Sequence, residues 1–341
     1  MNARMKISRP QLFVLGCAIV LCVFGMRGAA AQTTNEPTLV LSMNSTTGNI
    51  IVPRVSYSPD GRFLLSGAVP GQATLWDANT GASVRVFEPH AQGVFAVNFS
   101  TDGTLAATGD GAGNLRIWDV ATGIPTLSIP NAHRGGIYGV AFSSDATRIV
   151  TGGLDSLAKV WDSTSGELLF TLEGHLDYVG AVAFSPDDSL IATSSGDTNV
   201  ILWDSTTGEP ERTLSDHEGY LWDVAFSPDG TQIVTAGGPD LTARVWAVET
   251  GEVIAELEHP SDVQGAAWSD DGRFVLTGCA DGTAYLWEVE TAEIVETFSG
   301  HMNRVNGVAL SPDGFRAAAA SDDGSVMVWR IESALALTDT P

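Results

Sequence analysis

Histidine is the side chain most often used as a general base or metal ligand, and this sequence contains six. The spacing of these histidines indicates their role. They recur at intervals of 43, 42, 42, 42 and 42 residues and include every histidine of the chain: His90, His133, His175, His217, His259 and His301. Each begins a similar segment, such as "HLDYVGAVAFSPDD" at 175–188. A catalytic histidine is normally singular, whereas one repeated with every unit is architectural. We therefore interpret His175 as a structural residue.

Tryptophan keeps the same period. Seven of the nine tryptophans are 41 to 43 residues apart, and the first four are followed by Asp: Trp76, Trp118, Trp161, Trp203, Trp246, Trp287 and Trp329. Seven units of about 42 residues therefore fill the chain from roughly residue 38 to the end.

Each unit has the pattern of short strands. The fourth residue after each histidine is Val, Ile or Leu, and an Asp- and Gly-containing turn follows the apolar run. The segments after it, such as 190–195 and 200–204, are too short for helices. Four short strands cannot bury both faces alone, but seven such sheets stacked around an axis bury one another. The sequence predicts an all-β, seven-bladed β-propeller with four-stranded antiparallel blades.

The repeated "GH", "SPDG" and "WD" motifs resemble those of the WD40-repeat family over about nine-tenths of the chain. The resemblance implies a buried network in each blade that runs from the histidine through a hydroxyl residue and an aspartate to the tryptophan. Four units match it: His133, Thr151, Asp155 and Trp161; His175, Thr193, Asp197 and Trp203; His217, Thr235, Asp240 and Trp246; and His259, Thr277, Asp281 and Trp287. Such a network leaves no buried polar group unpaired, so each histidine acts as a clamp between strands.

Three units depart from this pattern. Ala112 stands at the aspartate position of the second unit, and Ala319 replaces the hydroxyl of the last. The first unit has Gly48 at the histidine position and Pro70 at the aspartate position. These changes lie beside the expected ring closure, where we expect residues 37–43 to supply the outer strand of the last blade.

The N-terminal residues have the pattern of a signal peptide. Arg4, Lys6 and Arg9 precede an apolar run at 12–26, and small residues follow at 29–31. We expect a signal peptide at 1–31, a short linker at 32–36 and the propeller at 37–341. The protein would then be exported, periplasmic or secreted, without membrane insertion after cleavage; the alternative is an uncleaved anchor.

The net charge and the cysteine content limit the classes of partner and site that this chain can have. The formal net charge is −24, with 13 basic and 41 acidic residues after residue 31, which disfavours nucleic acid and anionic lipid as partners. Acidic runs at 247–259 and 288–298 are expected to form a solvated rim, or alternatively to bind cations or basic peptides. Cys17 and Cys22 belong to the leader, and Cys279 is expected to be a small buried residue. No metal-ligand spacing or cofactor motif is present, and no catalytic residue is assigned.

The third and fifth residues after each histidine flank the apolar fourth one at the mouth of the first strand. By resemblance, this is a face on which such propellers bind peptides. Aromatic side chains gather in units two to five and polar ones in units six and seven: Phe95, Tyr138, Tyr178, Tyr220, Trp222, Asp262, Gln264, Arg304 and Asn306. These rings could equally plug the channel or pack on neighbouring blades. We expect a monomeric, non-enzymatic scaffold that binds a protein or peptide. The alternative is a propeller enzyme or small-ligand binder that uses the channel around Asp223 and Arg54.

Overall fold

The computed structural model describes residues 34, 35, 37–42 and 50–332, with backbone alone at 34, 35 and 39–42. These residues belong to one compact unit, Thr33–Pro341. The expected signal peptide at 1–31, with Cys17 and Cys22, lies outside the described residues, as does Gly48. Within the described ranges, no helix is long and apolar enough to cross a bilayer.

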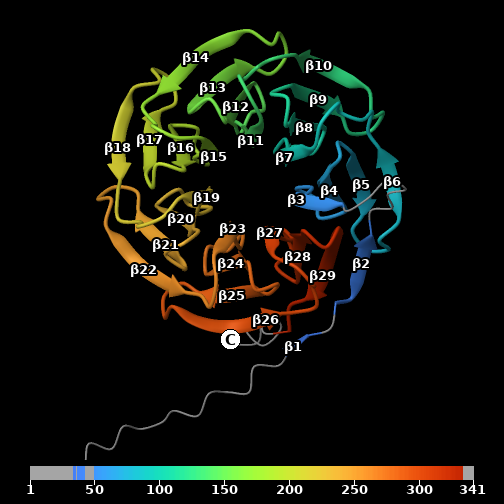
Figure 1. Cartoon of the computed structure of the whole chain (residues 1–341), viewed down its shortest axis with the longest axis vertical. Coiled ribbons are helices and arrows are strands. Elements are labelled where there is room, and N and C mark those ends of the chain that lie inside the picture. Colours follow the sequence, from blue (N-terminus) through green and yellow to red (C-terminus); the bar gives the residue numbers. More distant parts are fainter. Residues whose placement is uncertain (1–33, 36, 43–49, 333–341) are drawn as a thin grey trace, which may run out of the picture. The chain divides into compact units, whose positions relative to one another are not determined.

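The described strands form seven sheets arranged as a ring, and each sheet is one blade (Figure 1). The blades are numbered in chain order and their strands run from the centre outward. Blades 1 to 3 contain β3 (Ile51–Tyr57), β4 (Phe63–Val69), β5 (Ala73–Asp77) and β6 (Ser83–Val86); β7 (Val94–Phe99), β8 (Leu105–Asp110), β9 (Leu115–Asp119) and β10 (Pro125–Ile129); and β11 (Ile137–Phe142), β12 (Arg148–Gly153), β13 (Leu157–Asp162) and β14 (Leu168–Glu173).

Blades 4 to 6 repeat this order, and blade 7 contributes three strands of its own. They contain β15 (Val179–Phe184), β16 (Leu190–Ser195), β17 (Val200–Asp204) and β18 (Pro210–Leu214); β19 (Leu221–Phe226), β20 (Gln232–Gly237), β21 (Thr242–Ala247) and β22 (Val253–Glu258); β23 (Val263–Trp268), β24 (Phe274–Cys279), β25 (Ala284–Glu288) and β26 (Glu293–Phe298); and β27 (Val305–Leu310), β28 (Arg316–Ser321) and β29 (Ser325–Arg330). The prediction of a seven-bladed, all-β propeller is confirmed.

The N-terminal side of the chain closes the ring. Strand β2 (Leu39–Ser42) pairs antiparallel with β29, so the prediction that residues 37–43 complete the last blade is confirmed. Strand β1 (Thr34–Asn35) lies in the expected linker and pairs in parallel with β26 as a fifth strand of blade 6. Two adjacent blades are therefore tied by the same short N-terminal segment (Figure 1).

The core lies between blades. Val150 and Val160 of blade 3, for example, form one buried cluster with Val182 and Trp203 of blade 4. Trp203 is only 1% exposed. Each sheet thus buries its faces on its neighbours, which explains why a repeat of 42 residues without helices can be stable.

A β-bulge recurs at the inner end of the blades. In blades 2 to 7 the register shifts between the fourth and sixth residues after the histidine, as between Ile137 and Gly139. The fifth residue is therefore the unpaired one. A bulge redirects the extra side chain, and of the fifth-position residues Tyr138 lines the central channel cavity.

Candidate functional site

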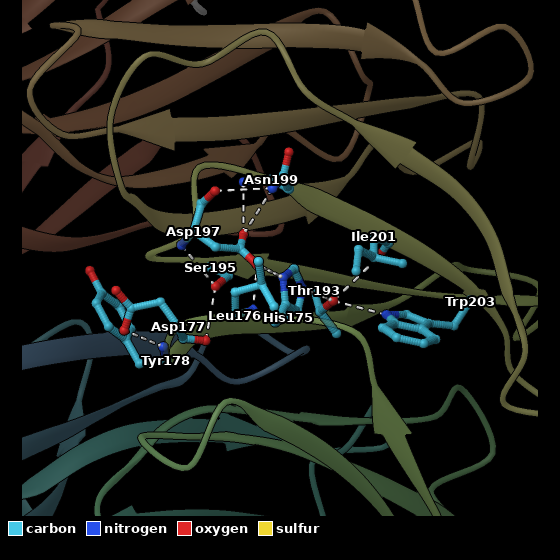
Figure 2. A network of polar contacts seen from close by, with 10 residues as sticks. All are labelled: His175, Leu176, Asp177, Tyr178, Thr193, Ser195, Asp197, Asn199, Ile201 and Trp203. Carbon is cyan, nitrogen blue, oxygen red and sulfur yellow. Dashed lines mark hydrogen bonds and ion pairs between the residues drawn. The ribbon is translucent and has the colours of Figure 1, made fainter.

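Blade 4 contains a complete polar network (Figure 2). His175 Nδ1 lies 2.9 Å from Asp197 Oδ2, and Nε2 lies 2.7 Å from Thr193 Oγ1. Trp203 Nε1 donates to the same hydroxyl at 2.9 Å. Because the carboxylate only accepts, His175 donates to Asp197 from Nδ1. Every member is satisfied, so the histidine links the start of the blade to its second strand.

Asp197 is held by further donors. Burial would raise the pKa of this carboxyl, but the backbone N–H of Leu176 and the contact with His175 lower it below its usual value. The Leu176 N–H donates to Oδ2 at 2.8 Å, and the Asn199 N–H donates to Oδ1 at 3.0 Å. The aspartate therefore also fixes the two loops at this end of the blade.

Blades 3 and 5 contain the same network. The structure brings together the predicted residues with histidine contacts of 2.5 to 2.7 Å and tryptophan contacts of 2.9 Å: His133, Thr151, Asp155 and Trp161, and His217, Thr235, Asp240 and Trp246. The extra Pro239 in the turn of blade 5 does not displace Asp240.

Blade 6 differs from its predicted network. Thr277 contacts both His259 and Trp287, at 2.7 and 2.9 Å, as expected. Asp281 instead accepts a hydrogen bond of 2.6 Å from the hydroxyl of Tyr285. The assignment of Asp281 as the partner of His259 is therefore wrong.

The residue after His259 gives the physical reason. In blade 4 this residue donates its N–H to the aspartate, but Pro260 has no N–H. His259 Nδ1 turns to the Leu257 carbonyl at 2.8 Å. Burial lowers the pKa of His259 to about 4, although the Leu257 carbonyl and Asp281 oppose this shift.

Blade 2 has a carboxylate that the sequence pattern missed. Ala112 stands at the expected position, but Asp110 Oδ2 lies 2.9 Å from His90 Nδ1. His90 Nε2 lies 2.7 Å from Thr108, which also accepts from Trp118 at 2.8 Å. The network is complete, because an acidic residue at the end of β8 reaches the same place as one in the following turn.

Blades 7 and 1 beside the closure are incomplete. His301 contacts Asp323 at 2.9 Å, but its Nε2 meets the backbone carbonyl of Ala319 at 3.2 Å. Trp329 Nε1 is buried without a hydrogen-bond partner among the described residues. In blade 1, Trp76 donates to Ser66 at 2.9 Å.

The predicted aromatic residues form one continuous row. The ring centroids of Phe95 and Tyr138 are 5.1 Å apart, and those of Tyr138 and Tyr178 are 6.4 Å apart. Trp222 continues the row, 5.6 Å from Tyr178 and 5.3 Å from Tyr220. All five rings are half-buried, so they pack on one another across blades 2 to 5 and keep part of their surface open.

Leucines extend this apolar surface. Leu176, directly after His175, is 89% exposed, and Leu154 is 46% exposed. The Leu154 N–H donates to the carbonyl of Gly136, two residues before Tyr138, which places it at the same end of the blade. We call Phe95, Tyr138, Tyr178, Tyr220, Trp222, Leu154 and Leu176 the aromatic face.

The predicted polar residues separate into exposed and buried members. Arg304 Nε lies 3.1 Å from Asp322, which also accepts from Asn306 Nδ2 at 2.7 Å. The Tyr220 hydroxyl approaches Asp262 at 3.5 Å, which joins the two groups. Gln264 is only 6% exposed, so it does not extend into solvent as the sequence suggested.

Arg54 crosses the channel beneath this face. Its Nη1 donates to the Asn306 carbonyl of blade 7 and its Nη2 to the Trp222 carbonyl of blade 5, both at 2.9 Å. Asp223 accepts from the backbone N–H of Ala266 at 3.2 Å. Burial raises the pKa of Asp223, and Arg54 partly offsets that effect. Both side chains line a channel cavity of about 470 Å³, most of whose walls are Ala, Gly and Val.

The remaining candidate groups for chemistry are possible metal ligands and the thiol of Cys279. Among the described residues, no three His, Cys, Asp or Glu side chains are placed to hold a metal ion together. Cys279 is fully buried, and burial raises its thiol pKa to about 12, so it is a packed residue as expected.

Comparison with known families agrees with this architecture. Residues 38–77, 81–119 and 292–330 match the family described as WD domain, G-beta repeat. Residues 136–288 match the family described as IFT122 first beta-propeller. No curated relative is similar enough to count as a match. The repeated networks, the seven blades and the matched repeats together show that the chain belongs to the WD40-repeat family.

Proposed function

We propose that the protein is an exported, non-enzymatic scaffold that binds a protein or peptide partner on its aromatic face. WD40 propellers are generally protein-interaction scaffolds. The observation that carries the proposal is the unbroken row of five half-open rings across four blades. Aromatic residues beside hydrogen-bonding groups are typical of interface hot spots.

The spacing of the row suits an extended peptide. Successive ring centroids lie 5.1 to 6.4 Å apart. Side chains on one side of an extended chain are about 6.7 Å apart, so alternate residues of a partner can meet successive rings. Leu176, at 89% exposure, adds an apolar contact at the edge of the row.

The scaffold holds this surface before binding. The bulges fix the fifth positions, and Arg54 links blades 1, 5 and 7 across the channel. A preordered surface loses little conformational entropy when a partner binds.

Charge and the N-terminal sequence support the remaining parts of the proposal. The net charge of −24 favours solubility and disfavours nucleic acid and anionic membrane surfaces. The basic and then apolar pattern of residues 1–31 supports export to the periplasm or medium, with a monomeric propeller as the mature form.

A crosslinking pull-down from the exporting cell's envelope and medium tests the proposal. The Phe95→Ala, Tyr138→Ala, Trp222→Ala triple variant should bind its partner at least about 30-fold more weakly. The matched control is the Val84→Ala, Val86→Ala, Ile254→Ala triple variant. It removes apolar side chains of the outer strands that are 47, 52 and 50% exposed. A partner kept by the first variant and lost by the control would contradict the proposal, as would the absence of any partner.

One observation favours a second function, which is catalysis or small-ligand binding in the channel. A carboxyl group with a raised pKa in a cavity is a frequent mark of a functional site, and Asp223 has both properties. Hydrolysis of an ester or lactone panel that disappears in Asp223→Asn would support it. Equal rates in the two proteins would exclude Asp223 as the catalytic group.

A further inference from the structure

Two opposite charges line the central channel cavity. Among the described inner-strand residues of its wall, only Arg54 and Asp223 are charged. They belong to β3 and β19, which face the channel from opposite sides of the ring (Figure 1). The matching position of the other five blades carries only Ala or Gly: Ala96, Gly139, Ala181, Gly265 and Gly307. The cavity of about 470 Å³ has the size of a small-ligand site.

The two charged groups are neighbours that do not form an ion pair. Arg54 Nη2 donates to the carbonyl of Trp222, the residue directly before Asp223. No contact of 4.0 Å or less joins their charged atoms in the part of the chain that the structure describes. Asp223 is instead held by the backbone N–H groups of Val224 at 3.0 Å and Ala266 at 3.2 Å. Backbone contacts therefore keep the carboxylate apart from the guanidinium.

Both groups keep hydrogen-bonding capacity for a ligand. Arg54 Nη1 donates to the carbonyls of Pro53 at 3.4 Å and Asn306 at 2.9 Å, and Nη2 donates to Trp222 at 2.9 Å. The Nε–H and one Nη2–H have no partner among the described residues, and two N–H groups of a guanidinium can bind both oxygens of a carboxylate. Each oxygen of Asp223 accepts one N–H and has a second lone pair for an ammonium.

This arrangement selects a molecule that carries both charges. A simple cation would bind Asp223 beside the positive charge of Arg54, and a simple anion would bind Arg54 beside Asp223 on a protein of net charge −24. A carboxylate and an ammonium on one carbon pair with both groups, so neither protein charge is left facing a like charge. The remaining walls are mostly Ala, Gly and Val, which suit an apolar side chain.

We propose that the channel cavity binds a free α-amino acid with an apolar side chain, through its carboxylate on Arg54 and its ammonium on Asp223. Both protein groups are fixed by backbone contacts before the ligand arrives, so little conformational entropy is lost on binding. This inference rests on the second proposed function, small-ligand binding in the channel, and names the class of ligand.

Isothermal titration calorimetry of the purified protein with L-alanine, L-valine and L-leucine tests the proposal. We expect at least one of them to bind. Its N-acetyl derivative lacks the ammonium and its amide derivative lacks the carboxylate, so each should bind at least about tenfold more weakly. γ-Aminobutyrate, whose charges are farther apart, should also bind at least about tenfold more weakly. Equal binding of the free and blocked forms would overturn the inference.

The variant Asp223→Asn locates the ammonium contact. It keeps the size of the side chain and removes its charge, so it should weaken the free amino acid at least about tenfold and the N-acetyl derivative hardly at all. The matched control is Asp270→Asn, which removes a carboxylate of the same cavity from the turn after β23. It should change binding of the free amino acid less than about threefold. Equal losses in the two variants would show that general negative charge attracts the ligand and would overturn the assigned contact.

Failure of this inference can be distinguished from failure of the channel function. If no free amino acid binds but an ester or lactone is hydrolysed in a reaction that Asp223→Asn abolishes, the channel is functional and the assignment of its ligand is wrong. If no amino acid binds and no panel compound reacts, both proposals for the channel are wrong. Neither result changes the proposed peptide binding, which the aromatic-face variants test separately.

Discussion

Blade 4 and blade 6 carry a histidine, a threonine, an aspartate and a tryptophan at matching positions and use them differently. In blade 4 the aspartate contacts the histidine at 2.9 Å and takes the N–H of the next residue. In blade 6 the next residue is Pro260, and Asp281 contacts Tyr285 instead. Where the aspartate lies in the turn, as in blades 3, 4, 5 and 7, the backbone N–H of the residue after the histidine also holds it.

The difference shows that the hydroxyl and carboxylate parts of the network can occur separately. Thr277 still accepts from Trp287 and contacts His259, so the inner half survives without the aspartate. In blade 7 the reverse holds, because Asp323 remains and the hydroxyl is missing. Hydroxyl and carboxylate are therefore separable, and substitutions can test their contributions one by one.

Removing the hydroxyl from an intact network should have the largest effect. Thr193→Val leaves His175 Nε2 and Trp203 Nε1 buried without a partner, which should lower the free energy of unfolding by about 2–4 kcal/mol. Urea unfolding followed by tryptophan fluorescence measures it. Thr213→Val on the exposed outer strand is the control and should be close to neutral. Equal effects of the two changes would show that the hydroxyl does not hold the blade together.

The pH dependence should separate blade 6 from a blade with a complete network. The folded pKa of His259 is about 4, below the usual 6.5, so the folded state binds fewer protons between these values. The neutral His259 therefore contributes about 3 kcal/mol to the free energy of unfolding above pH 6.5, and this contribution is lost as the pH falls to 4. His259→Gln should flatten stability across that window.

In blade 3 the loss should come at lower pH. Burial would raise the pKa of Asp155, but the His133 contact and the Arg134 N–H lower it to about 2 from 3.8. This carboxylate therefore stabilises the fold above pH 4 and loses its contribution as pH falls to 2. Asp155→Asn should flatten stability below pH 4 only. A change between pH 4 and 6.5 in this variant would contradict the assignment.

Restoring the missing hydroxyl in blade 7 should stabilise the protein. Ala319→Thr places a hydroxyl between His301 and the unpartnered Trp329 N–H, as Thr193 does in blade 4. We expect a gain of about 1 kcal/mol in the free energy of unfolding. Ala318→Thr, on the neighbouring buried position of β28, is the control and should destabilise. A loss in both variants would show that blade 7 has no room for the network.

The fold could be predicted from the sequence because the same motifs recur in every unit. Seven tryptophans and six histidines at one period determine the number of blades, and the short alternating segments determine their strands. The addition of β1 to blade 6 was not predictable, because the two residues Thr34–Asn35 carry no alternating pattern of their own. The closing strand β2 was predictable because the last unit is one strand short.

The candidate site was predictable in its residue types and less so in its geometry. Phe95 and Tyr138 could be placed on one face from their position after the histidine, but their mutual contact depends on the bulge. Gln264 occupies the same bulged position as Tyr138 but is only 6% exposed, which its polar type did not predict. Pro260 was a signal that could have been used, since a residue without an N–H cannot hold the aspartate.

The substitution Pro260→Ala should convert blade 6 towards blade 4 with the smallest change in stability. The new N–H can hold Asp281, but the unfolded chain gains conformational freedom, so the two effects should nearly cancel to within about 0.5 kcal/mol. The pKa of His259 should nevertheless rise from about 4, because the carboxylate can then approach its ring. An NMR titration of the imidazole measures this pKa directly.

The same substitution combined with Asp281→Asn should leave the pKa of His259 low, since the added N–H has no carboxylate to hold. If the pKa rose equally in both proteins, the proline would act through backbone geometry, and the missing donor would not explain the difference between the blades.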